Sequence, residues 1–311
     1  MKLTIIACAL LAALFSCNKS DIRNPAPDKK LIQLPNADDS DLSSISAASA
    51  SVPRPDHIIF AWFENHQYSQ IVGNSQAPYI NSLIPKATLL TNMFALTHPS
   101  YPNYIAMFSG STQGVTTDGC LTNRPFDKPN LYTVLHKISK SFAWYSEDLP
   151  KMGAVVCSYN NYQQKHNPTT AFKNVADNAN KPFNMFNWSD TSASNMSKLE
   201  TVVCITPNKL HSMHDQVITY QGDQWLKSKL SKVIEWCRRH NSIFVIYYDE
   251  GTSHSNQLAV MLLGLHVKRN FKLATKYNHY SFTKFVAHTY NADSTYNSNL
   301  KNAKGVSGFY F

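Results

Sequence analysis

The chain has 311 residues, of which 43% are hydrophobic and 16% charged, and its formal net charge is +9. This length and composition can bury a full core, and they exclude a fibrous or mostly disordered protein. The basic residues are scattered, with no runs interleaved with stacking aromatics and no zinc-finger spacing, so nucleic-acid binding has no support and anionic ligands are only weakly favoured.

The first 16 residues have the features of an export signal, with Lys2 ahead of an apolar stretch at 3–15. This stretch is shorter than the roughly 20 residues that cross a bilayer, so a permanent membrane helix is the weaker interpretation. The ending Leu14-Phe15-Ser16-Cys17 resembles a bacterial lipobox, which implies cleavage before Cys17 and a lipid on it. We therefore expect an exported lipoprotein anchored at a periplasmic membrane face or the cell surface, with simple secretion as the alternative.

Residues 18–55 contain Asp, Ser, Ala, Asn and five prolines with little periodicity. This composition is typical of a flexible linker. We expect it to separate the lipid-bearing end from one globular domain at 56–311.

From residue 56 onward, short apolar runs alternate with longer mixed segments. The apolar runs predict strands at 57–63, 89–96, 141–145, 202–205, 243–248 and 258–263, several of them apolar enough to be covered on both faces. Segments 130–139 and 223–239 read as helices, and 151–200 as a long loop or small insertion. This alternation predicts an α/β fold with a largely parallel sheet.

Six cysteines occur, of which Cys8 would leave with the signal and Cys17 would carry the lipid. An even number remains, which is compatible with two disulfides outside the cytoplasm. Chain order favours Cys120–Cys157 and Cys204–Cys237 among the three possible pairings, and buried free thiols are the alternative.

The octamer THPSYPNY at 97–104 places Ser100 between Pro99 and Pro102. Proline fixes its own φ and disfavours helical geometry in the residue before it, so we predict a constrained, non-helical elbow. A simple tight turn is the alternative on these residues alone.

Two pairs of side chains with oxygen ligands, each containing at least one carboxylate and called the acidic pairs below, follow predicted strands. Glu64-Asn65 ends the first strand and Asp249-Glu250 ends the fifth, at the carboxyl edge where open α/β sheets bind ligands. Their oxygens suit a divalent cation, although each pair alone also fits a helix cap or a solvated turn. Ser100 follows the 89–96 strand and reaches the same edge, where a metal could activate its hydroxyl as a nucleophile.

Two histidines lie in predicted loops and offer cationic or hydrogen-bonding groups. His166 follows a tyrosine-rich segment, and His214 follows the 202–205 strand. Each could bind a phosphoryl oxygen or protonate a leaving alkoxide, and a surface or core role is the alternative.

An ordered set of motifs resembles the bacterial phosphoesterase family of acid phosphatases, phosphatidylinositol phosphatases and phospholipases C. The set comprises Glu64-Asn65-His66, the elbow with 105–110, the segment 145–150, KHNP at 165–168, Pro207-Asn208 with His214-Asp215, Gly222-Asp223 and Asp249-Glu250-Gly251. The resemblance implies an alkaline-phosphatase-like three-layer fold, with a largely parallel sheet between helices. Two stretches near the expected site, 209–213 and 252–255, depart from the family pattern, so substrate identity is not transferred.

The resemblance also implies the roles of individual residues. Metal ligands would be Glu64, Asn65, Asp249 and Glu250, with Ser100 as the nucleophile that completes the metal shell. His166 and His214 would serve the phosphate or the leaving group, and Asn103 and Asn123 are candidate substrate contacts.

We therefore expect a metal-dependent phosphoesterase that hydrolyses phosphate monoesters through a phosphoserine intermediate. One divalent ion (Ca, Mg, Mn or Zn) is implied, and the substrate is a small phosphorylated molecule or a phospholipid headgroup. The alternatives are a phospholipase C-type phosphodiesterase and a non-catalytic surface lipoprotein that binds glycans or phosphorylated ligands.

Overall fold

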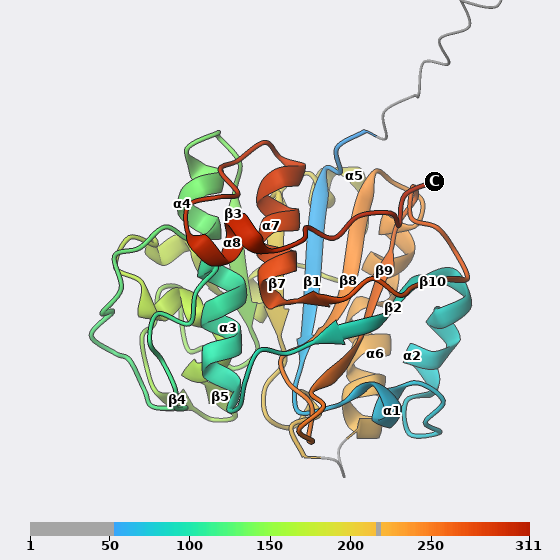
Figure 1. Cartoon of the computed structure of the whole chain (residues 1–311), viewed down its shortest axis with the longest axis horizontal. Coiled ribbons are helices and arrows are strands. Elements are labelled where there is room, and N and C mark those ends of the chain that lie inside the picture. Colours follow the sequence, from blue (N-terminus) through green and yellow to red (C-terminus); the bar gives the residue numbers. More distant parts are fainter. Residues whose placement is uncertain (1–52, 216–218) are drawn as a thin grey trace, which may run out of the picture. The chain divides into compact units, whose positions relative to one another are not determined.

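A nine-stranded sheet organises the computed structural model, which describes residues 53–215 and 219–311 (Figure 1). The strand order is β10-β2-β9-β8-β1-β7-β3-β6, and β11 also pairs with β2. The strands are β1 His57–Phe63, β2 Thr88–Phe94, β3 Phe142–Ser146, β6 Asn180–Pro182, β7 Val202–Thr206, β8 Ser242–Tyr248, β9 Gln257–Leu263, β10 Phe271–Leu273 and β11 Tyr277–Asn278. A separate hairpin joins β4 Ser158–Tyr159 to β5 Tyr162–Gln163.

Most neighbouring strands of this sheet pair in parallel. β1 pairs in parallel with β7 and β8, for example Ala61 with Ile205 and Phe63 with Tyr248. β9 pairs antiparallel with both β8 and β2, so these two neighbours run in the same direction. The segments that follow β1, β2 and β8 therefore leave the sheet at the same edge.

Helices cover both faces of the sheet, and Figure 1 shows α3, α7 and α8 on the viewer's side and α6 behind it. The α-helices are α1 Tyr68–Ile71, α2 Pro78–Leu83, α3 Ser100–Ser109, α4 Leu131–His136, α5 Ala193–Met196, α6 Thr219–Cys237, α7 His279–Thr289 and α8 Ser298–Asn302. Single 3₁₀ turns are η1 Ile84–Lys86, η2 Gln164–His166, η3 Pro168–Ala171, η4 Asp177–Ala179 and η5 Phe183–Met185. This arrangement confirms the predicted three-layer α/β fold.

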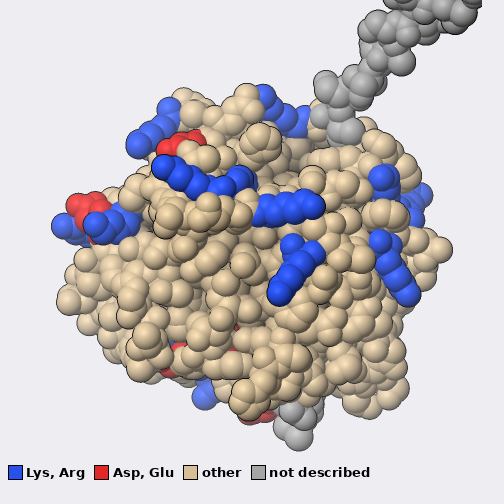
Figure 2. All heavy atoms as spheres, viewed as in Figure 1, with Lys and Arg blue, Asp and Glu red and all other residues tan. Residues whose placement is uncertain are grey.

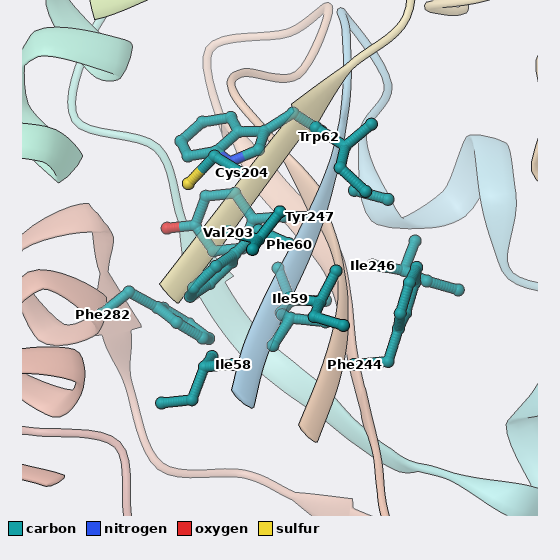
Figure 3. Packing of buried hydrophobic residues seen from close by; sticks show 14 of the residues in the cluster. Ile58, Ile59, Phe60, Trp62, Val203, Cys204, Phe244, Ile246, Tyr247 and Phe282 are labelled. Atoms are coloured by element: carbon teal, nitrogen blue, oxygen red, sulfur yellow. The ribbon is translucent and has the colours of Figure 1, made fainter. Parts of the chain in front are cut away.

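The core lies on both faces of the central strands, as the continuously apolar β1 predicts (Figure 3). On one face, Phe282 of α7 packs edge-on against Phe60 and Tyr247. On the other, Trp225 of α6 packs edge-on against Phe63. Burial of alternate residues against different helices keeps β1 rigid at the point where it delivers Glu64.

The six predicted strands are confirmed to within two residues at each end. The non-helical elbow is wrong, because Ser100 is the first residue of α3, with Pro99 as N-cap and Pro102 in the first turn, where proline is tolerated. All ten residues of α3 are buried, so the helix has no polar face to reveal it in the sequence. The segment 151–200 is mostly irregular, as expected, but it contributes β6 to the sheet.

The Cys120–Cys157 disulfide is confirmed, whereas the predicted Cys204–Cys237 pair is wrong. Both of the latter thiols are buried and free. Cys204 lies on β7 beside Trp62, on the face covered by α7, while Cys237 ends α6 on the opposite face (Figures 1 and 3). The sheet separates them.

The signal segment, Cys17 and nearly all of the predicted linker lie outside the described residues, so these features stay predictions. Within the described residues, no helix is long and apolar enough to cross a membrane.

Candidate active site

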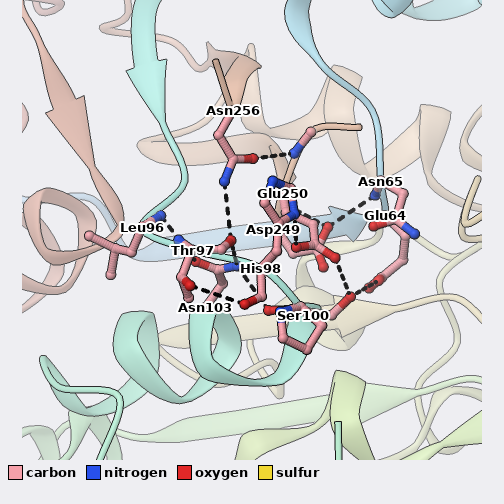
Figure 4. A network of polar contacts seen from close by, with 12 residues as sticks. Glu64, Asn65, Leu96, Thr97, His98, Ser100, Asn103, Asp249, Glu250 and Asn256 are labelled. Atoms are coloured by element: carbon pink, nitrogen blue, oxygen red, sulfur yellow. Dashed lines mark hydrogen bonds and ion pairs between the residues drawn. The ribbon is translucent and has the colours of Figure 1, made fainter. Parts of the chain in front are cut away.

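The two acidic pairs and Ser100 meet at the carboxyl edge of the sheet (Figure 4). Ser100 Oγ donates hydrogen bonds to Glu250 Oε1 at 3.0 Å and to Glu64 Oε2 at 3.3 Å. The backbone N–H of Asn65 donates to Asp249 Oδ1 at 3.1 Å, which joins the end of β1 to the end of β8. The structure therefore brings together the five residues that the sequence proposed as metal ligands.

Backbone geometry at the strand ends aims these side chains. Asn65 has a φ of 46°, in the left-handed region that asparagine tolerates better than most residues, so the chain turns sharply after Glu64. The backbone N–H of Glu64 donates to the carbonyl of Ser212 at 2.8 Å, and that of Asp249 to Phe63 at 3.2 Å. Both acidic pairs thus leave the sheet on fixed backbone.

The three carboxylates are buried and close together, so their charges interact strongly. Burial raises the pKa of Asp249 well above its ordinary value, and the neighbouring charges of Glu64 and Glu250 raise it further. Burial alone would also raise the pKa of Glu64, but His166, Tyr104 and Lys165 outweigh it and lower the value to about 2. A buried group of like charges of this kind favours a bound cation.

A divalent cation fits the donors found here. Asp249 Oδ1 accepts hydrogen bonds from the N–H groups of Asn65 and Glu250, whereas its Oδ2 is buried with no hydrogen-bond partner in the described structure. In the described ranges, His, Cys, Asp and Glu side chains alone form no group of three with metal-site spacing. The fit therefore also uses the amide oxygen of Asn65 and the hydroxyl of Ser100, all hard ligands.

Backbone atoms around Ser100 occupy the side-chain amide of Asn103, a predicted substrate contact. Its Oδ1 accepts from the N–H groups of Leu96 (3.1 Å) and Thr97 (3.2 Å). Its Nδ2 donates to the carbonyls of Thr97 (2.8 Å) and Pro99 (3.3 Å). The side chain is fully buried and anchors the loop before α3, so the structure gives no support to the predicted substrate contact.

Asn256 and His98 also hold this loop, and the sequence did not single them out. Asn256 Oδ1 accepts from Gly251 N at 2.6 Å and its Nδ2 donates to the Thr97 carbonyl at 3.1 Å. His98 Nδ1 lies 2.6 Å from Glu250 Oε2. Asn256 lies five residues after Gly251 and belongs to none of the motifs, so no local signal in the sequence points to it. His98 is an exposed histidine before a proline, which is equally unremarkable in the sequence.

The two predicted histidines lie near the cluster in different environments. His166 is buried, with Nε2 3.1 Å from Glu64 Oε2 and its ring stacked on Tyr104, whose hydroxyl donates to Glu64. The His166–Glu64 contact is not aligned as a hydrogen bond, so Nε2 lacks an aligned partner among the described residues. His214 is 29% exposed, and its ring centroid lies 6.3 Å from that of His166.

Asn123 is exposed in a turn, and no hydrogen bond in the described structure joins it to the carboxylate cluster. Its predicted substrate contact therefore has no structural support. Lys165, by contrast, is linked to the start of α3. Its Nζ lies 2.7 Å from Asp118 Oδ2, and Asp118 Oδ1 accepts from Tyr101 N in the first turn of that helix.

Two further motifs, the segment 145–150 and Pro207-Asn208, contribute to a second polar group at the ends of β3 and β7. Glu147 accepts from the backbone N–H of Asn208 at 3.0 Å and from the indole of Trp225 at 3.0 Å, and it lies 2.8 Å from His211 Nδ1. Burial would raise the pKa of Glu147, but these contacts outweigh it and lower the value. This group braces the loop that leads to His214.

Comparison with known proteins identifies the family. A sequence model of the phosphoesterase family matches residues 61–293. The phosphatidylinositol-3-phosphatase of Mycobacterium tuberculosis is 37% identical over 225 residues, which cover 72% of this chain and 73% of that protein. A phosphate-repressible acid phosphatase of Penicillium chrysogenum is 30% identical over 240 residues, 73% of this chain but only 57% of the relative.

Solved structures agree at the level of the fold. The lipoteichoic acid synthase LtaP of Listeria monocytogenes superposes with a TM-score of 0.57 at 10% identity, over 80% of this chain and 76% of that one. A protein of the alkaline phosphatase superfamily from Vibrio parahaemolyticus gives 0.52 at 10% identity, over 81% and 70%. The chain therefore belongs to the phosphoesterase family, with an alkaline-phosphatase-like fold.

Proposed function

We propose that this phosphoric ester hydrolase acts on phosphate monoesters through a phosphoserine intermediate on Ser100, with a divalent metal ion as cofactor. The observation that carries the proposal is the Ser100 hydroxyl at the start of α3, within hydrogen-bond reach of two buried carboxylates. Acid phosphatases and a phosphatidylinositol phosphatase among the relatives support monoester hydrolysis.

In the first step, Ser100 Oγ attacks phosphorus, so that the Oγ–P bond forms as the bond from phosphorus to the leaving alkoxide breaks. The hydroxyl proton has two acceptors in reach, Glu250 Oε1 and Glu64 Oε2. In the second step, water attacks phosphorus and the Oγ–P bond breaks, which releases inorganic phosphate and restores the serine. The position of Ser100 at a helix N-terminus also favours the anionic phosphoryl group.

The histidines supply the remaining proton transfer and binding contacts. The buried Nε2 of His166, which lacks an aligned partner in the described structure, is suited to donate to a phosphoryl oxygen. The more accessible His214 is suited to protonate the leaving alkoxide as the P–O bond breaks.

The metal would be held by oxygens of Glu64, Asn65, Asp249 and Glu250 together with Ser100. A divalent ion bound there supplies Lewis-acid stabilisation of the negative charge that develops on the phosphoryl group. The buried, unpartnered Asp249 Oδ2 supports this assignment.

The test uses p-nitrophenyl phosphate and p-nitrophenyl phosphorylcholine, each with and without EDTA. We expect turnover of the monoester, its loss with EDTA and its recovery when a divalent ion is restored. Faster turnover of the diester would favour a phospholipase C-type phosphodiesterase instead, and no turnover of either would leave a non-catalytic binding protein. Ser100→Ala should abolish turnover and the phosphorylated Ser100 peptide seen by mass spectrometry after acid quench; retained turnover would refute the nucleophile.

We further propose that the protein is exported and anchored through a lipid on Cys17. The Cys120–Cys157 disulfide supports an oxidising compartment, since such bonds rarely persist in the cytoplasm. Incorporation of radiolabelled palmitate in the wild type and its loss in Cys17→Ala would support the anchor. Equal labelling of both would refute it.

A further inference from the structure

A groove of about 850 Å³ lies beside the active site and plays no part in the mechanism above. We call it the basic groove. It is lined by the end of β2, the 254–256 loop, the start of α7 and the segment 302–304. Its polar lining residues include Thr97, His98, His254, Lys276, Asn278 and Lys304.

His98 connects the groove to the reacting centre. It lines the groove, and its Nδ1 lies 2.6 Å from Glu250 Oε2, while Glu250 Oε1 accepts from Ser100 Oγ at 3.0 Å. In Figure 4, Leu96, Thr97 and His98 lie on one side of the acidic pair of β8, and Glu64 and Asn65 on the other. The side chains of His98 and Glu250 therefore form the contact path between the groove and Ser100.

The groove is positively charged. Its lining includes Lys276, Lys304 and two histidines, and no Asp or Glu. Asn278, the N-cap of α7, and Ser281 also line it, so the positive end of this 11-residue helix faces the same space. The face of the molecule seen in Figure 2 likewise shows many Lys and Arg side chains and few Asp and Glu.

Contacts hold the two lysine-bearing segments in place. Lys276 Nζ lies 5.3 Å from the ring centroid of Phe94, which also lines the groove. Lys284 Nζ donates to the carbonyl of Ala303 at 2.9 Å and to that of Lys301 at 3.1 Å, which fixes the segment that carries Lys304 to α7. The two ammonium groups therefore extend from anchored backbone.

We propose that the basic groove binds a second anionic group on the leaving-group side of the substrate. The preferred substrate is then a phosphate monoester of a polyol that carries another phosphate, and not a monoester with a neutral leaving group. This inference rests on the proposed function. The second anion has two possible sources, a soluble bisphosphate or the phosphodiester of a lipid headgroup, and both present the same charged oxygens to the lysines.

The experiment compares kcat/KM for four substrates: inositol 1,3-bisphosphate, inositol 3-phosphate, short-chain phosphatidylinositol 3-phosphate and p-nitrophenyl phosphate. The variant is Lys276→Gln combined with Lys304→Gln, and the matched control is Lys137→Gln, an exposed lysine just after α4 and outside the groove. We expect the wild type to prefer the doubly anionic substrates over inositol 3-phosphate. Loss of two exposed charge contacts should lower that preference about five-fold, chiefly through KM.

Each outcome decides the matter. A reduced preference for the bisphosphate, the lipid or both in the double variant, with no change in Lys137→Gln, supports the groove and identifies the source of the anion. An unchanged preference for both, or no preference in the wild type, overturns it. If the wild type hydrolyses no substrate, the proposed function fails, and calorimetric titration with inositol 1,3-bisphosphate tests the groove by itself. Equal Kd values for wild type and double variant would then refute it.

Discussion

Removal of the Asn103 side chain should lower both the stability of the protein and its kcat, whereas removal of an equally buried asparagine far from Ser100 should lower the stability alone. Asn103 is fully buried and makes four hydrogen bonds, all to backbone atoms of the loop that delivers Ser100. If the structure is right, the residue acts on catalysis only by holding that loop.

The magnitude follows from these four bonds. Each intramolecular hydrogen bond contributes about 1 kcal/mol net, so Asn103→Ala should lower the free energy of unfolding by about 3 to 4 kcal/mol. The loop then relaxes, and a displacement of Ser100 on the order of 1 Å can cost about a hundred-fold in rate. We expect kcat to fall by about ten- to a hundred-fold, with KM changed much less.

Urea unfolding measures the stability, and p-nitrophenyl phosphate turnover under conditions where the variant is folded measures kcat and KM. Asn130→Ala is the matched control, because Asn130 is equally buried and also forms hydrogen bonds at both ends of its amide. Its Oδ1 accepts from Thr133 N and so caps α4, and its Nδ2 donates to Lys128 O and Asn174 Oδ1. The control should lose stability but keep its kcat. A stable Asn103→Ala with raised KM and unchanged kcat would refute the reasoning and support the predicted substrate contact of Asn103.

Three further predictions follow from the same contacts. Removal of divalent ions with EDTA should lower both activity and Tm; a Tm insensitive to EDTA would contradict the metal. Asp249→Asn should raise the Tm of the metal-free protein, because burial and the charges of Glu64 and Glu250 oppose ionisation of this carboxyl and a neutral amide avoids that cost. Replacement of Cys120 and Cys157 by Ala should lower the free energy of unfolding by about 4 kcal/mol for a loop of 37 residues, whereas a reductant should leave the Tm of that variant unchanged. The pKa of Glu147 is lower in the folded chain than its ordinary 4.5, so its stabilising contribution is present above pH 4.5 and is lost as pH falls through the lowered value. Glu147→Gln should therefore be less stable than the wild type by about 2 kcal/mol at pH 7 in urea unfolding, and this difference should shrink at pH 3; a constant difference would contradict the assignment.

The sequence predicted the central strands and the acidic pairs because each depends on local pattern. After its first residue each of β1 and β8 is a run of aliphatic and aromatic residues, and Glu64 or Asp249 follows it directly. The length and burial of each strand and the polar residue after it can therefore be predicted from the local sequence. Parallel pairing then requires the carboxyl ends to share an edge, which explains why the candidate metal ligands were found together.

Features that depend on neighbours distant in sequence needed the fold. Ser100 opens a helix whose every residue is buried, so no periodicity could distinguish α3 from a loop between prolines. Nothing in the sequence around Cys204 and Cys237 distinguishes free thiols from a disulfide pair, and only the sheet between them keeps them apart.

By itself, then, the sequence determined the strands, the family motifs and the chemistry of the side chains at the sheet edge. Only the tertiary structure decided how Ser100 is held: Asn103 and Asn256 bond to backbone on the same loop from different parts of the chain, and His98 reaches Glu250 across 152 positions. Hydrogen bonds to backbone atoms leave no residue-type pattern in sequence, because any residue supplies the same N–H and C=O groups.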